Sequence, residues 1–270
     1  MRYGVSMMVF AHADLEAALR RIAASGFDRI EINSEPPHLC SGEYDPRVVR
    51  GWLDDLGLRA PVGHGLFSHD NPNAAALDEA DRRRSVEIMA SCFEPLVTVG
   101  AEVVVLHPTG YAKDYCDDNR QAHVDQARRS MRELAKVGAD LGIRMAWENL
   151  PHHGAARPLH DMRELRPLIE DMPAHVGLCL DTTHAVIAGH DPIEQLNIAS
   201  DRLFCLHLHD TDGQRDCHWV PGRGVIDWQQ FVARLDETAF NGTRTLEVTS
   251  TPQTAEDVVA EAFGVALRWG

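Results

Sequence analysis

The sequence lacks the segments by which membrane proteins and exported proteins are recognised. Hydrophobic residues make up 44% of its 270 positions. Even so, no run approaches the ~20 consecutive apolar residues of a membrane-spanning helix. The opening residues, MRYGVSMMVFAHADLEAALRR, show neither the charged flank nor the long apolar core of a secretory signal. We therefore expect a cytoplasmic protein with no membrane partner.

Two further shortages narrow the class of protein. The six cysteines form no C-x-x-C pair, and Cys179 and Cys205 lie inside apolar runs, which predicts buried thiols in a reducing compartment. Basic residues are also few, since 26 Lys and Arg stand against 41 Asp and Glu, for a formal charge of −15. Nucleic acid and anionic membranes repel such a protein, so both are disfavoured as partners.

What the sequence does contain is a regular alternation of short apolar runs with helix-like stretches. Eight strand–helix units of this kind are typical of a parallel sheet covered by helices. A barrel built from eight such units needs ~250 residues, so we predict one domain over residues 1–270. The predicted strands cover residues 3–9, 27–33, 58–62, 102–107, 143–149, 175–181, 202–209 and 243–248. The predicted helices cover residues 14–25, 45–56, 77–99, 118–141, 159–170, a stretch starting near Asp191, 228–238 and 254–269.

An open, doubly wound sheet is the alternative to a closed barrel. That fold binds its ligand at a topological switch point, commonly through a Gly-rich phosphate turn. The first predicted strand ends in Met7-Met8-Val9 with no G-x-G-x-x-G after it, and polar residues end several of the strands. We therefore predict an α/β fold of the (β/α)8 TIM-barrel type.

Five polar residues each follow a short apolar run: His107, Glu148, Asp181, His209 and Glu247. In a parallel barrel, residues at the carboxyl ends of the strands point into the site of chemistry. An ion pair or a structural hydrogen bond explains any one of these residues alone. Several buried carboxylates would repel one another unless a cation compensated them. The set therefore predicts a divalent-metal site.

The motifs around these residues resemble the xylose-isomerase-like barrel superfamily over nearly the whole chain. That superfamily contains sugar isomerases, keto-sugar 3-epimerases, inosose-processing enzymes and endonuclease IV. The motifs are W-E-N at Glu148, L-D-T-T-H at Asp181, H-L-H-D-T-D-G at His209 and L-E-V at Glu247. The resemblance places the four metal ligands of the epimerase branch on these four residues. His209 is preferred to His207 as the ligand because it lies at the end of the strand. His207 points to the same side by the two-residue period, but it lies further inside the barrel.

The resemblance implies a metal-dependent isomerase or epimerase that acts on a small keto-sugar or a polyol-derived ketone. Oxygen-rich ligation with one imidazole suits Mn²⁺, Mg²⁺ or Co²⁺, and Zn²⁺ is compatible. Glu148 and Glu247 would form the acid/base pair and move protons through an enediolate. The resemblance places substrate contacts at His184 and Arg215, and solvation in a charged loop is the alternative for Arg215. Phe10 and Phe67 are the preferred aromatic wall residues by resemblance and position, with core packing or loop anchoring as the alternative.

Endonuclease IV carries additional metal ligands, and this chain has suitable residues at those positions as well. They are His64, His107, His184, Asp216 and His218, of which the last two form a D-x-H spacing. Together with the four core ligands they would build a multinuclear zinc site that activates water at a phosphodiester. Alternatively, these histidines contact a small substrate, as the resemblance implies for the small-molecule members.

The charge balance favours the small carbohydrate substrate, because a nuclease grips its polyanion with Lys and Arg. The one attractive anion site is the turn Pro221-Gly222-Arg223-Gly224, and we expect an unphosphorylated substrate. A metal-dependent lyase or dehydratase is also compatible, since an enediolate can expel a β-hydroxyl. A binding module has no need of two carboxylates on one metal. The superfamily often forms dimers or tetramers, so a homo-oligomer fits the resemblance.

Overall fold

A closed barrel brings the ends of the predicted strands to one rim. The computed structural model describes residues 2–67, 73–110, 115–151, 157–249 and 253–270. Its eight parallel strands follow chain order round the barrel, and β1 pairs with β8 to close it, so the predicted (β/α)8 TIM barrel is confirmed. The strands are β1 (Tyr3–Ser6), β2 (Arg29–Asn33), β3 (Arg59–His64), β4 (Val103–Leu106), β5 (Arg144–Glu148), β6 (Val176–Asp181), β7 (Leu203–Leu208) and β8 (Arg244–Leu246).

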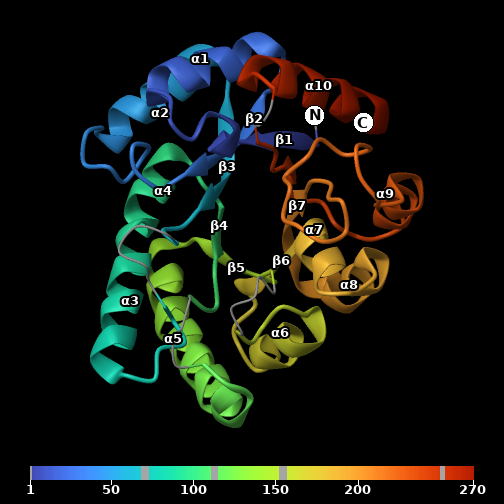
Figure 1. The fold of residues 1–270 in the computed structure, drawn as a ribbon. Helices are drawn as coiled ribbons and strands as arrows, with labels where there is room; N and C mark the ends of the chain where they lie inside the picture. The colour runs from blue at the N-terminus through green and yellow to red at the C-terminus, as the bar shows by residue number, and fades with distance from the viewer. Residues whose placement is uncertain (1, 68–72, 111–114, 152–156, 250–252) are drawn as a thin grey trace.

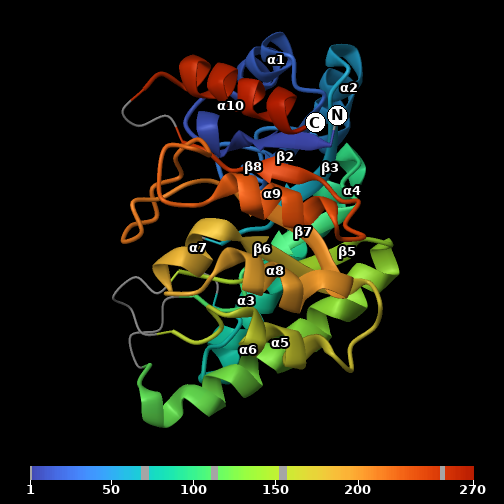
Figure 2. The same cartoon turned by 90° about the vertical axis from the view of Figure 1, so that its right-hand side faces the viewer.

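Helices cover the outside of the barrel (Figure 1). The last helix lies beside the first, and both chain termini lie on that side of the molecule (Figures 1 and 2). Within the described ranges, no helix is long and apolar enough to cross a membrane. The α-helices are α1 (Leu15–Ser25), α2 (Pro46–Leu56), α3 (Glu79–Ser91), α4 (Phe93–Val99), α5 (Arg120–Leu141), α6 (Met162–Ile169), α7 (Thr182–Ile187), α8 (Pro192–Ala199), α9 (Trp228–Asp236) and α10 (Ala255–Trp269). The 3-10 turns are η1 (Met7–Phe10), η2 (Asp117–Asn119) and η3 (Ser200–Arg202).

The prediction of one continuous helix over residues 77–99 is wrong, because the structure divides this stretch at Cys92. Helix α3 ends at Ser91, and α4 begins at Phe93. Pro95 explains the division. It has no N–H to donate to the Ser91 carbonyl, and its ring would collide with that carbonyl in a continuous helix.

A second difference lies between β6 and β7, where the sequence predicts one helix starting near Asp191. The structure has α8 there, with Asp191 as its N-cap, and adds α7 directly after β6. Asp181 is the N-cap of α7, and its Oδ1 accepts a hydrogen bond from the backbone N–H of His184 at 2.7 Å. This cap fixes the positions of Asp181 and His184 relative to each other at the rim.

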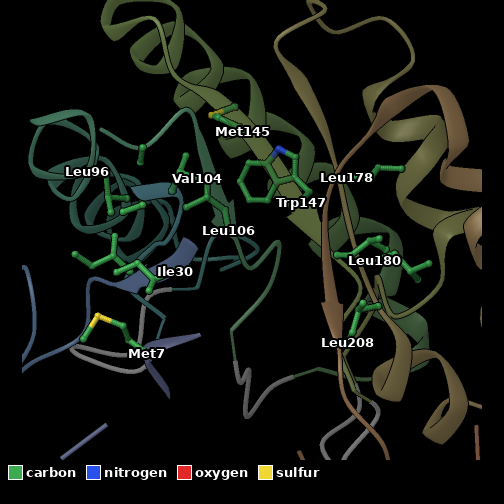
Figure 3. Packing of buried hydrophobic residues seen from close by; sticks show 14 of the residues in the cluster. Met7, Ile30, Leu96, Val104, Leu106, Met145, Trp147, Leu178, Leu180 and Leu208 are labelled. Atoms are coloured by element: carbon green, nitrogen blue, oxygen red, sulfur yellow. The ribbon is translucent and has the colours of Figure 1, made fainter. Parts of the chain in front are cut away.

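Side chains on the strands alternate between the barrel interior and the layer beneath the helices. Along β5, Met145 and Trp147 belong to the main apolar cluster under the helices, part of which Figure 3 shows. Ala146 belongs instead to a small cluster with Cys179 and Cys205. Glu148 follows Ala146 by two residues and therefore also faces the interior. The same period directs the polar strand ends of the other strands inward.

Candidate functional site

A cavity of about 580 Å³ opens at the carboxyl ends of the strands. Its polar lining comes from residues at or just after the ends of β3 to β8, which is where a barrel concentrates functional side chains. Asp181 and His209 lie among these residues and are fully buried. The sequence-predicted residues that line the cavity itself are His64, Phe67, His107, Glu148, His184, Asp216, His218 and Glu247.

Three carboxylates and one imidazole form the centre of the site. His207 Nδ1 lies 3.1 Å from Glu148 Oε1, 3.4 Å from Glu247 Oε2 and 4.0 Å from Asp181 Oδ2. None of these four residues is more than 4% exposed. On its other side, His207 Nε2 lies 2.8 Å from Glu31 Oε2. A carboxylate behind the second ring nitrogen fixes the orientation of an imidazole, as is usual for metal-binding histidines.

His209 also reaches this centre. Its Nε2 lies 2.7 Å from Asp181 Oδ2 and 3.7 Å from Glu247 Oε2. Its ring stacks on that of His218, with 4.1 Å between the ring centroids. Both histidines therefore present a ring nitrogen to the predicted carboxylate ligands, so position along the strand does not decide which of them is the nitrogen ligand.

Two groups of donors flank the centre. On one side, Glu148 Oε2 faces the Nε2 atoms of His64 at 3.6 Å and His107 at 3.2 Å. On the other side, Asp216 Oδ2 lies 3.2 Å from His184 Nε2 and 3.2 Å from His218 Nε2. Each group gathers three donors of the types that bind divalent metals.

The two predicted acid/base carboxylates have different electrostatic surroundings. Burial opposes ionisation of Glu148, but the neighbouring histidines, His207 foremost, hold the pKa of Glu148 well below its usual value. For Glu247 burial prevails over the attraction of His207 and His218, and the charge of Glu148 adds to it, so the pKa of Glu247 rises to about 8. Near neutral pH, the protein's own charges therefore leave Glu148 ionised and Glu247 protonated.

The donor set fits a divalent cation. His209 Nδ1 is buried and makes no hydrogen bond within the described part of the chain, and Glu148 Oε2 has only the imidazole nitrogens of His64 and His107 facing it. Such atoms are costly unless a ligand satisfies them. Carboxylate oxygens combined with imidazole nitrogens suit Mn²⁺, Co²⁺ or Zn²⁺, and the carboxylates also suit Mg²⁺. A cation at the centre would offset the repulsion between carboxylates that share one site.

Two of the predicted substrate contacts lie away from the cavity. The Arg215 side chain is 73% exposed, and its Nη2 pairs with Asp212 Oδ2 at 2.7 Å. Phe10 belongs to the hydrophobic core, because Met7–Phe10 form the turn η1 rather than the end of the first strand. Met8, from the same turn, lines the cavity instead.

Phe67 does line the cavity, and its ring centroid lies 4.9 Å from that of His107. Sequence reasoning missed three other residues. Glu31 could have been found, because it is a lone acid at an interior position of an apolar strand. Arg157 and Thr109 also line the cavity, but they lie in loops, where no periodicity indicates the direction of a side chain.

Comparison with known proteins places this architecture in a known group. A family model described as xylose isomerase-like TIM barrel matches residues 19–268. The solved structure of a D-tagatose 3-epimerase-like protein superimposes with a TM-score of 0.87, at 23% identity, over 100% of this chain and 97% of that one. An inosose dehydratase of Geobacillus kaustophilus is 29% identical, over 83% of this chain and 86% of its own length. The uncharacterized protein MJ1311 of Methanocaldococcus jannaschii is 28% identical, over 92% of this chain and 83% of its own.

Proposed function

Because the chain belongs to the xylose isomerase-like TIM barrel family, we propose that it is a divalent-metal-dependent isomerase or epimerase. Its substrate would be a small keto-sugar or a polyol-derived ketone. The arrangement of Glu148 and Glu247 carries this proposal. The two carboxylates line one cavity, but Glu148 ends β5 and Glu247 follows β8, and these strands are not neighbours in the barrel. They can therefore approach a bound substrate from different sides.

Glu148, Asp181 and Glu247 would hold the metal, together with a ring nitrogen of His207 or His209. His207 has the stronger geometry, because its Nδ1 faces all three carboxylates while Glu31 holds its Nε2. When bound, a divalent cation supplies Lewis-acid stabilisation of the negative charge that develops on the substrate's oxygen atoms. Mn²⁺, Mg²⁺ and Co²⁺ fit the carboxylate-rich centre, and Zn²⁺ is compatible with it.

The chain's own residues would move the proton. One of the two carboxylates takes it from the carbon next to the substrate carbonyl, and the other is positioned to return a proton from a different side. Return on the same face to the neighbouring carbon gives isomerisation, whereas return on the opposite face of the same carbon gives epimerisation. Phe67 and Met8 line the cavity and would exclude water from the substrate carbons.

The test is incorporation of solvent deuterium into ketoses and inosose-type ketones by the metal-loaded protein. We expect the metal-dependent exchange to be abolished in Glu247→Gln, with the fold intact by circular dichroism. Glu237→Gln is the matched control, because that side chain is 69% exposed on the surface. Exchange at the wild-type rate in Glu247→Gln would contradict the assignment. Exchange accompanied by a new enone would identify a dehydratase instead.

The flanking donor groups favour a second candidate, a multinuclear zinc phosphoesterase. His64 and His107 share Glu148 with the centre, while His184 and His218 meet at Asp216. Two or three Zn²⁺ per chain, with hydrolysis of a phosphate ester, would support this candidate. One Mn²⁺ or Co²⁺ per chain would support the isomerase. Metal analysis of the purified protein separates the two.

A further inference from the structure

One basic side chain lies in the wall of the cavity. Arg157 is 5% exposed and lines the cavity together with Glu148 and the histidines described above. Its Nε donates a hydrogen bond to the Pro151 carbonyl at 3.1 Å, which anchors the guanidinium. Among the described lining residues no other Lys or Arg occurs. The position therefore supplies a fixed positive charge inside a cavity that otherwise holds carboxylates and imidazoles.

A hydroxyl group lines the same cavity from the neighbouring strand end. Thr109 follows β4, Arg157 lies in the segment after β5, and these two strands are paired. Thr109 is 2% exposed, and its Oγ1 is buried without a hydrogen-bond partner in the part of the chain that the structure describes. A buried hydroxyl of this kind is costly unless a ligand satisfies it. A guanidinium and a hydroxyl together are suited to bind an oxyanion.

We infer that the substrate carries an oxyanion, a carboxylate or a phosphate, which Arg157 and Thr109 bind while its ketone end faces Glu148 and Glu247. This inference rests on the proposed isomerase or epimerase function and specifies its substrate class. A phosphate there would contradict the expectation of an unphosphorylated substrate, and either anion would lie away from the turn Pro221-Gly222-Arg223-Gly224, the one attractive anion site in the sequence. The Arg223 side chain is held by Glu261 of α10, with Nε donating at 2.7 Å, and does not line the cavity.

Three ketoses of the same carbon skeleton test the inference: D-fructose, D-fructuronate and D-fructose 6-phosphate. We expect the metal-loaded wild-type protein to exchange deuterium faster into one or both anionic ketoses than into D-fructose. Arg157→Gln should lower kcat/KM for the preferred anionic ketose by roughly 10- to 100-fold, the range for a charge-assisted hydrogen bond, mainly through KM. The loss on D-fructose, which carries no oxyanion, should be clearly smaller, and Arg157→Lys should recover part of the loss on the anionic ketose. The control is Arg132→Gln, at a side chain that is 52% exposed on α5.

The outcomes separate this inference from the proposed function. Preference for D-fructose, or equal losses on all three ketoses in Arg157→Gln, would overturn the anion site and leave the isomerase proposal standing. If wild type exchanges none of the three, the proposed function loses its support, and calorimetric titration of the metal-loaded protein decides the anion site. Binding of an anionic ketose that Arg157→Gln abolishes supports the site. Absence of binding, or equal binding to wild type and variant, overturns it.

Discussion

At the scale of single residues, the site is organised around an imidazole held between carboxylates. His207 contacts Glu31 through one ring nitrogen and faces Glu148, Asp181 and Glu247 through the other. Hydrogen bonds to a carboxylate orient a metal-binding imidazole and raise its basicity. His207 is therefore the stronger of the two candidate nitrogen ligands. Glu31 is the residue that keeps its ring in place.

The prediction at this scale concerns metal affinity. His207→Asn should raise the dissociation constant for Mn²⁺ by more than His209→Asn does, because it removes the nitrogen that faces all three carboxylates. Glu31→Gln should raise the dissociation constant for Mn²⁺ by about 10- to 100-fold, because it removes the carboxylate that orients the His207 ring. Free Mn²⁺ measured by electron paramagnetic resonance reports these constants. His175→Asn is the control, since His175 lies away from the site against the Ala135 carbonyl. A larger loss in His209→Asn would make His209 the ligand.

The residue scale also shows where sequence reasoning stops. Strand-end residues such as Glu148 and Glu247 can be located from the sequence. The two-residue period of a strand shows that their side chains point into the barrel, and the end of the apolar run shows that they lie at its carboxyl-terminal rim. His207 and His209 share one facing, so only their distances to the carboxylates could distinguish them. The direction of the Arg157 side chain depends on the conformation of a loop, and a loop has no sequence periodicity from which that direction could be predicted.

At the scale of elements, the position of a helix over the barrel depends on a few buried polar contacts. Arg82 of α3 is fully buried. Its guanidinium donates to Glu79 Oε2 on its own helix at 3.0 Å and to Ser130 Oγ and Glu133 Oε1 on α5, each at 2.9 Å. It thereby joins α3 to α5.

The break between α3 and α4 at Cys92 could have been predicted from the sequence. Pro95 is a sufficient signal for it, and the prediction of a single helix overlooks that proline.

We expect Arg82→Met to lower the free energy of unfolding by about 2 kcal/mol, because the buried Ser130 hydroxyl and the carboxylates of Glu79 and Glu133 lose a charged hydrogen-bonding partner. Urea denaturation followed by circular dichroism measures the change. Arg83→Met is the matched control on the same helix. Its side chain is 65% exposed and pairs with the same Glu79, so we expect no measurable loss. Equal losses in the two variants would show that the contacts with α5 contribute nothing.

At the scale of the whole molecule, the barrel collects acidic and basic groups whose ionisation is coupled to folding. Burial opposes the charged form of His64, but Glu148 raises the pKa of His64 to about 9. Asp216 has the same effect on His218, whose pKa is also about 9, while the pKa of Glu247 is about 8. The folded metal-free protein therefore binds more protons than the unfolded chain between pH 6.5 and 8.5. The free energy of unfolding falls as pH rises through that window.

Metal binding should reverse this dependence, since a bound cation requires its ligands to be deprotonated. We expect the chelator-treated protein to have a lower Tm at pH 8.5 than at pH 6.5, and Mn²⁺ to raise the Tm more at pH 8.5. At a Mn²⁺ concentration of about 100 times Kd, the stabilisation is about 2.7 kcal/mol, or roughly 5–10 °C for a chain of this size. Differential scanning calorimetry at both pH values measures it, and Ca²⁺, which prefers more oxygen ligands, is the control. A Tm that Mn²⁺ leaves unchanged at pH 8.5 would show that these carboxylates and histidines do not form a metal site.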